Sequence, residues 1–195
     1  MNNKILIVSA AVLLLCGCAA TSPKTVVYTL EPDSFDGMTN EPALGREILV
    51  ENTTVRDAYK NKSLMASPKA FELTKRANAE WAESAGALLN SAVRDYLAPR
   101  CAKILPPEWK SRVPYDASLI VHLDALTQCK RGDNWFAVLR LSYEVLPKGG
   151  GKPIVSGRFD KAQPLSSGDL ENYVAAQSGL VIEWLNGLLA ELRSL

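Results

Sequence analysis

The chain has 195 residues, enough for one domain of ordinary size and too few for two. Apolar residues make up 47% and charged residues 22%, which is typical of a globular protein and excludes a disordered one. Lys and Arg (22) nearly balance Asp and Glu (21), so the formal charge of +1 argues against a nucleic-acid-binding protein. A single histidine argues against multi-histidine metal sites, and we expect neither a metal nor a cofactor.

The N-terminal residues indicate the cellular compartment. Lys4 precedes an apolar run from Ile5 to Leu15, which is too short to span a bilayer core of ~30 Å and fits the hydrophobic region of a secretory signal peptide. The next residues, Leu15-Cys16-Gly17-Cys18, resemble a bacterial lipobox, and Cys18 fits as the modified residue because the small Gly17 precedes it. The alternative is an ordinary signal peptide with two incidental cysteines.

The resemblance to bacterial lipoprotein precursors implies that residues 1–17 are removed and that Cys18 carries a diacylglycerol and an acylated amino group, with palmitate-type chains. Several acyl chains, at ~0.8 kcal/mol per buried methylene, make such an anchor effectively permanent. Ala19 follows the cysteine, and by enteric-type sorting the absence of Asp there favours the periplasmic face of the outer membrane. Without Lys4 the mature chain has 21 basic and 21 acidic residues, so net charge provides no attraction to anionic lipid.

Residues 18–24 form a lipidated anchor and short linker, and 25–195 form one domain. Its first half predicts strands at Thr25–Leu30 and Arg46–Val55, separated by a loop, and then a possible short hairpin of Ser63–Ala66 and Ala70–Thr74. A helix is expected over Asn78–Ala98, with Asn78 as its N-cap. Its apolar stripe consists of Trp81, Ala85, Leu88, Leu89, Ala92, Val93, Tyr96 and Leu97.

The second half predicts a three-stranded meander and a long helix. Apolar and polar residues alternate over Ala117–Leu126 and Asn134–Leu146, and a glycine-rich turn leads to a third strand at Ile154–Asp160. The helix is expected over Asp169–Leu192, capped by Ser166 or Ser167. The fold class is therefore α+β, with two amphipathic helices on one face of an antiparallel or mixed sheet.

Cysteine usage predicts one disulfide. With Cys16 discarded and Cys18 lipidated, Cys101 and Cys129 remain, and an even pair in the oxidising periplasm favours a bridge. Closing this loop is expected to stabilise the fold by about 3–4 kcal/mol. The alternative is two free thiols. Their spacing is not a zinc signature.

The sequence contains few signals for chemistry. His122 and Asp124 share a strand face, but no nucleophile is placed beside them, so a solvated histidine is the better interpretation. Gly149–Lys152 lacks the spacing of a phosphate-binding loop and is interpreted as a hairpin turn. The charged stretch Arg56–Lys62 is interpreted as a solvated loop. No catalytic residue is predicted.

Several short motifs together resemble a known family. Tyr28-Thr29-Leu30-Glu31-Pro32 follows the anchor closely, and Ala79-Glu80-Trp81-Ala82-Glu83 opens the first expected helix. With the lipobox, the meander and the final helix from Tyr173, this order resembles the ABC-type transport auxiliary lipoproteins, the PqiC-like family.

This resemblance implies a non-enzymatic subunit of an envelope lipid transport system that maintains envelope integrity. The domain would dock an MCE-domain protein that reaches across the periplasm from a permease or ABC transporter, and a homo-oligomer is compatible with this role. The surface for docking would be an exposed part of the last helix or an uncovered sheet edge. The alternative is a lipoprotein that itself binds a lipid or envelope polymer in an apolar groove, and an enzyme is a third, weaker hypothesis.

Overall fold

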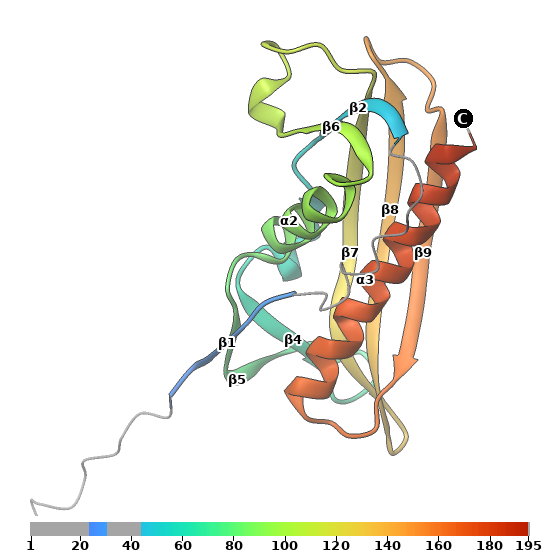
Figure 1. Ribbon diagram of the computed structural model, residues 1–195. Coiled ribbons are helices and arrows are strands. Elements are labelled where there is room, and N and C mark those ends of the chain that lie inside the picture. The colour runs from blue at the N-terminus through green and yellow to red at the C-terminus, as the bar shows by residue number, and fades with distance from the viewer. Residues whose placement is uncertain (1–23, 31–43, 195) are drawn as a thin grey trace, which may run out of the picture.

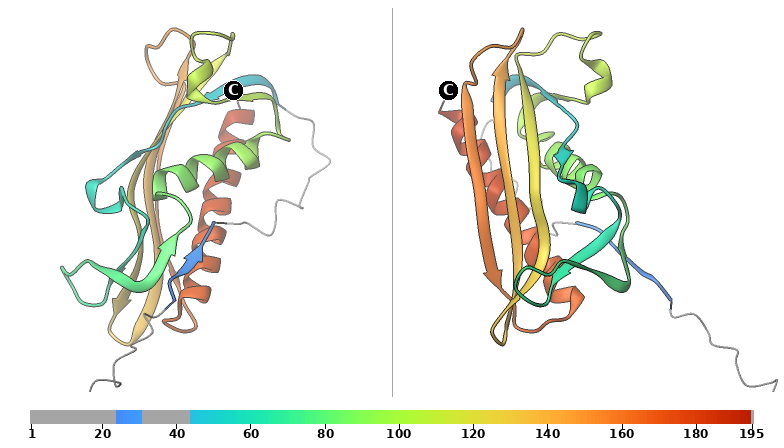
Figure 2. Two further views of the ribbon diagram at one scale, coloured as in Figure 1. Left: turned by 90° about the vertical axis from the view of Figure 1, so that its left-hand side faces the viewer. Right: turned by 180° about the vertical axis from the view of Figure 1, so that it is seen from behind.

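The computed structural model describes residues 24–30 and 44–194. In these residues nine strands form one mixed, curled sheet, and two long helices pack on one of its faces, which confirms the expected α+β fold (Figures 1 and 2). The helices are α2 (Ala85–Leu97) and α3 (Leu170–Arg193), and η1 (Asp57–Tyr59) and η2 (Pro107–Trp109) are short 3-10 turns. The strands are β1 (Val26–Tyr28), β2 (Leu44–Val50), β3 (Thr54–Val55), β4 (Ser63–Ser67), β5 (Thr74–Trp81), β6 (Cys101–Leu105), β7 (Ala117–Arg131), β8 (Asn134–Pro147) and β9 (Val155–Pro164).

The long strand β7 organises the sheet. Along one edge it pairs antiparallel with β8 from one end to the other, and β9 continues this meander, as the alternating sequence predicts. Along its other edge, three short strands pair with successive segments of β7, all parallel to it: first β2, then β3, then β4. The outer strands follow from these, with β6 beside β2, β5 beside β4, and β1 beside β5.

A bulge changes which side chains of β7 face the helices. The pairing with β8 shifts register between Leu123 and Ala125. Because side chains alternate along a strand, one extra residue moves the following side chains to the opposite face. Before the bulge Leu123 is fully buried in the core, and after it Gln128 reaches the loop before α3, where its Nε2 donates to the Gly168 carbonyl (3.0 Å). Thr127 and Cys129 flank Gln128 in the strand, so their side chains lie on the sheet face opposite the helices.

Aromatic side chains fill the space between the sheet and the helices. Trp81 of β5 and Tyr173 of α3 are buried, and their ring centres lie 6.1 Å apart. Trp184, also on α3, is buried and packs against Tyr143 of β8 at 5.9 Å. The apolar stripe of the last helix is thus mostly core. No helix within the described part of the chain has the length and hydropathy needed to span a membrane.

The start of the first helix differs from the prediction. Thr74–Trp81 is strand β5, paired with β4 and β1, and α2 begins only at Ala85. Asn78 is not an N-cap: its φ of 56° lies in the left-handed region within that strand. The cap is Ser84, whose Oγ accepts from the Ala87 N–H (3.4 Å). Strand pairing on both edges of β5 overrides the local helical spacing that included Trp81.

Other boundaries also differ. The predicted strand Arg46–Val55 divides into β2 and β3, because each pairs with a different segment of β7. The hairpin exists, but its second strand begins at Thr74. Strand β6 was not predicted. The N-cap of α3 is Asp169, which accepts from the Asn172 N–H (2.8 Å), rather than Ser166 or Ser167.

The predicted Cys101–Cys129 disulfide is not present in this fold, in which both thiols are free. Ile104 and Ala117 lie at the same level because both pair with Ile48 on parallel strands. Cys101 comes before Ile104 on β6, whereas Cys129 comes twelve residues after Ala117 on β7. Twelve strand residues extend about 40 Å, whereas the Cα atoms of a disulfide lie within about 7 Å of each other.

The assignment of the helix start can be tested by substitution. Ser84→Ala should lower the free energy of unfolding by about 1 kcal/mol, because the first turn of α2 loses its capping oxygen. If the helix began at Asn78, Ser84 would be an interior residue and alanine would stabilise the protein. Urea denaturation followed by circular dichroism gives the sign. Asn78→Gly is the matched control, and it should be neutral or stabilising because glycine tolerates a φ of 56°.

Candidate binding surface

The residues singled out in the sequence do not form one site. The predicted signal peptide and Cys18 lie outside the described residues. His122 is exposed, and its Nδ1 is hydrogen-bonded to the Thr54 hydroxyl on β3. In the described part of the chain no group of three or more His, Cys, Asp or Glu residues could hold a metal ion. The remaining candidates are surfaces rather than a catalytic centre.

One such surface is the sheet face opposite α2 and α3, which we call the open face. It presents alternate side chains of β7, β8 and β9, among them Ile120, His122, Arg140, Ser142, Glu144, Ser156, Arg158 and Asp160. A shallow groove of about 460 Å³ crosses it near His122, Ser142 and Ser156. Most of these side chains are polar because no helix covers them (Figure 2).

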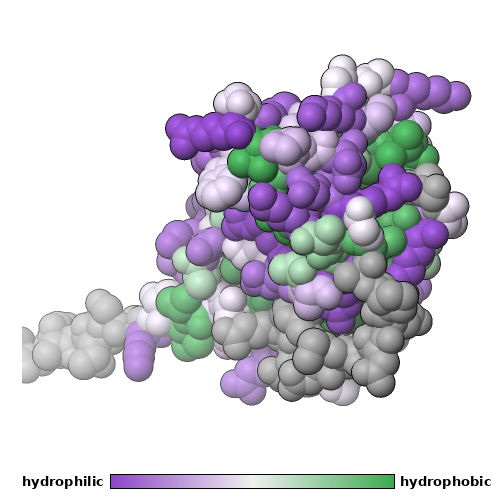
Figure 3. Space-filling model, turned by 45° about the horizontal axis from the view of Figure 1, so that its top comes forward, coloured by the Kyte–Doolittle hydropathy of each residue, from purple (hydrophilic) through white to green (hydrophobic). Residues whose placement is uncertain are grey.

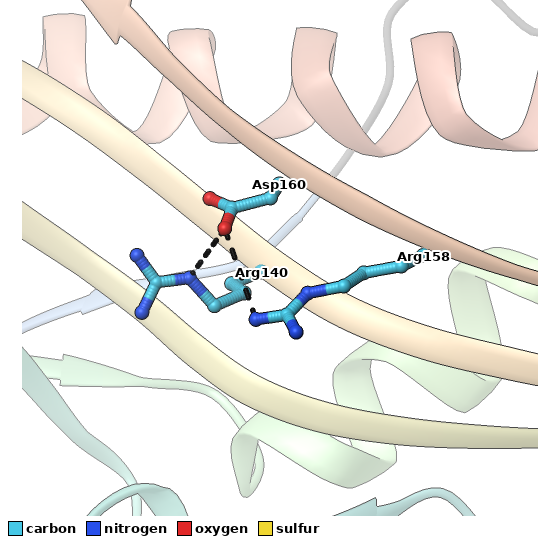
Figure 4. Close-up of polar contacts among 3 residues, drawn as sticks. All are labelled: Arg140, Arg158 and Asp160. Carbon is cyan, nitrogen blue, oxygen red and sulfur yellow. Dashed lines mark hydrogen bonds and ion pairs between the residues drawn. The ribbon is translucent and has the colours of Figure 1, made fainter.

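Charges on the open face are partly paired. Asp160 on β9 accepts from Arg140 Nε on β8 at 3.0 Å, and it lies 3.8 Å from a terminal nitrogen of Arg158 (Figure 4). All three side chains are well exposed, so solvent screening limits each pair to about 1 kcal/mol or less. One carboxylate shared by two guanidinium groups leaves this part of the sheet with excess positive charge.

A larger groove of about 790 Å³ lies farther along the same face, and we call it the basic groove. The segment around η1 and the β4–β5 loop form one wall, and the ends of β7 and β8 form the floor and the other wall. Its lining includes five cationic side chains and one carboxylate, Glu72. The cations are Arg56, Lys69, Lys130, Arg131 and Arg140.

The bulge in β7 builds the floor of the basic groove. It directs Thr127 and Cys129 away from the helices, and the Thr127 hydroxyl donates to the Met65 carbonyl (3.0 Å), which ties β7 to β4. Tyr59 closes the η1 side and is itself buried, so desolvation raises the pKa of its phenol. At the far wall the Arg131 guanidinium stacks over the Phe136 ring at 5.2 Å.

Apolar side chains stand beside this charge. Phe71 in the β4–β5 loop is fully exposed and has a left-handed φ of 66°, and Leu73 is 41% exposed. Elsewhere, on the side of the molecule seen in Figure 3, the described apolar residues form only small patches among hydrophilic ones.

Sequence reasoning missed the basic groove. It treated Arg56–Lys62 as a solvated loop and judged lipid attraction by net charge alone. The groove unites three segments, around Arg56, Lys69 and Lys130, that are far apart in the chain. The Lys130-Arg131 pair at a strand end was the one local signal.

Comparisons with known proteins agree on the fold. A family model described as the ABC-type transport auxiliary lipoprotein component matches residues 28–185. A search of curated proteins found no match. The crystal structure of protein XCC0632 from Xanthomonas campestris superposes with a TM-score of 0.67 at 20% identity, covering 85% of this chain and 90% of that one. A PelC dodecamer from Paraburkholderia phytofirmans has a TM-score of 0.50 at 17% identity, covering 79% and 94%.

The two thiols provide a test of the basic groove. Cys129 lines it, whereas Cys101 is 5% exposed and burial raises the pKa of its thiol to about 11. At pH 8 Cys129 should therefore react at least about 10-fold faster than Cys101. At Cys129 added salt should slow an anionic aromatic disulfide reagent and leave the rate of a neutral pyridyl disulfide nearly unchanged, because salt screens the attraction of the groove for the anion. Peptide mapping of the labelled protein measures both rates. An equal salt dependence of the two reagents would contradict a basic groove.

Proposed function

Because the chain belongs to the ABC-type transport auxiliary lipoprotein family, we propose that it is an outer-membrane lipoprotein that docks an MCE-type assembly in lipid transport between membranes. Residues 1–17 are the signal peptide in this proposal, and Cys18 carries the lipid on the periplasmic side. The single domain 25–195 then acts without catalysis. Its role is to hold the partner at the membrane and so to maintain envelope integrity.

The open face is the observation that carries the docking role. Both helices pack on one side of the sheet, so the meander offers a partner a broad polar surface. Interfaces between proteins that also exist apart are about as polar as the rest of the surface. In the described residues β9 pairs only with β8, so its other edge is also open to a partner strand.

The filled interior favours docking over storage of a ligand. A lipid held between the sheet and the helices would need the space that Trp81, Tyr173 and Trp184 occupy, and each of these is at most 2% exposed. The alternative of a lipid-holding protein therefore has less support from this fold.

Oligomerisation fits the same role. A ring of copies would present several open faces to one MCE assembly. PelC, which shares the fold, was solved as a dodecamer, and this supports the proposal that the present chain also assembles with itself.

Photo-crosslinking in the native envelope tests the docking role. A benzoylphenylalanine at Ser156, exposed on β9 of the open face, should capture an MCE-domain protein that mass spectrometry identifies. The matched control is the same probe at Ala175, exposed on α3, which should capture at least about 10-fold less of it. Capture of lipid or peptidoglycan alone at Ser156 would contradict docking and favour the ligand-holding alternative.

A further inference from the structure

The direction of β1 shows where the chain leads toward the anchor. β1 runs parallel to β5, with Val26 opposite Ala79 and Tyr28 opposite Trp81. β5 itself begins at Thr74, directly after the β4–β5 loop. The chain that precedes Val26 therefore leads toward the end of the molecule that carries this loop.

The views of the molecule agree with this register. The start of β1, the β4–β5 hairpin and the β7–β8 turn lie in the lower part of the molecule in Figure 1, and the C-terminus lies at the upper end (Figures 1 and 2). Lys24 is the sixth residue after Cys18, and six residues of extended chain reach at most about 22 Å. A lipid on Cys18 consequently keeps the lower end close to the membrane.

The lower end combines positive charge with exposed apolar side chains. Lys69, Lys130 and Arg131 surround this end of the basic groove, whose lining includes one carboxylate, Glu72. Other carboxylates close by include Asp133 in the β7–β8 turn, Glu80 opposite Val27, and Asp169 next to Gly168, which borders Trp135. Exposed apolar residues accompany the basic side chains on the β4–β5 loop and on β1: Phe71, Leu73, Val26 and Val27. Basic side chains next to exposed aromatic and aliphatic ones are the combination that binds the surface of an anionic bilayer.

We propose that this end of the protein contacts the membrane that holds its anchor. Phe71 enters the headgroup region, and Lys69, Lys130 and Arg131 bind phosphate groups of anionic phospholipids. The proposal rests on the proposed lipidation of Cys18. It also gives the domain an orientation, with η2 and the β8–β9 turn directed into the periplasm.

The test uses the full lipidated chain in vesicles of phosphatidylethanolamine and phosphatidylglycerol. A benzoylphenylalanine at Phe71 should form phospholipid adducts, detected by mass spectrometry, at least about tenfold more often than the same probe at Ile154. Ile154 is a matched control because it is 40% exposed and lies beside the β8–β9 turn at the opposite end. A probe at Leu73 repeats the measurement if the Phe71 variant does not fold.

The same crosslinking assay tests whether the basic side chains contribute to membrane contact. The double substitution Lys130→Glu and Arg131→Glu should lower the adduct yield at position 71 several-fold, and vesicles of phosphatidylcholine alone should do the same. Equal yields at positions 71 and 154, or adducts at 71 only with other protein copies, overturn the proposal.

The mass of the N-terminal peptide distinguishes a failure of the proposed lipid anchor from a failure of the proposed membrane contact. If Cys18 carries lipid and the yields are equal, membrane contact is wrong and the anchor stands. If Cys18 carries no lipid, the anchor is wrong, and the membrane contact that rests on it is overturned as well.

Discussion

The backbone of β7 is the constraint on which the rest of this structure depends. Fifteen residues of one strand must have hydrogen-bond partners on both edges. β8 satisfies one edge over its whole length, but the other edge is satisfied by three short strands from an earlier part of the chain. Because these strands are separated by turns, the segments between them project from the sheet. The wall of the basic groove is one of those segments.

The bulge at Leu123–Ala125 lets the same strand serve two surfaces. Before it, β7 buries aliphatic residues under the helices and exposes polar ones such as His122. After it, Gln128 points to the helix side and is fully buried there, accepting from Arg76 Nε (3.1 Å), while Thr127 and Cys129 face the groove. A regular strand would have placed these residues on the opposite faces, and the floor of the groove would not exist.

Net charge and local charge lead to different conclusions for this protein. The mature chain expected from the sequence is neutral, yet five cations and one carboxylate line one groove. Electrostatic attraction to a surface falls off within about 10 Å at moderate salt, so it depends on where charges gather and not on their sum. The family assignment identifies a transport auxiliary lipoprotein. This local charge, together with the direction of β1, supports the orientation that we propose for the domain at a membrane.

The sequence by itself determined the α+β class, the meander, the final helix and the family, because alternation, helical spacing and short motifs are local properties. It did not determine the start of α2, the split between β2 and β3, or strand β6, since each depends on pairing with strands remote in the chain. The separation of Cys101 from Cys129 and the gathering of Arg56, Lys69 and Lys130 were likewise decided only in the tertiary structure. Parallel pairing along β7 places residues side by side that no spacing in the sequence relates.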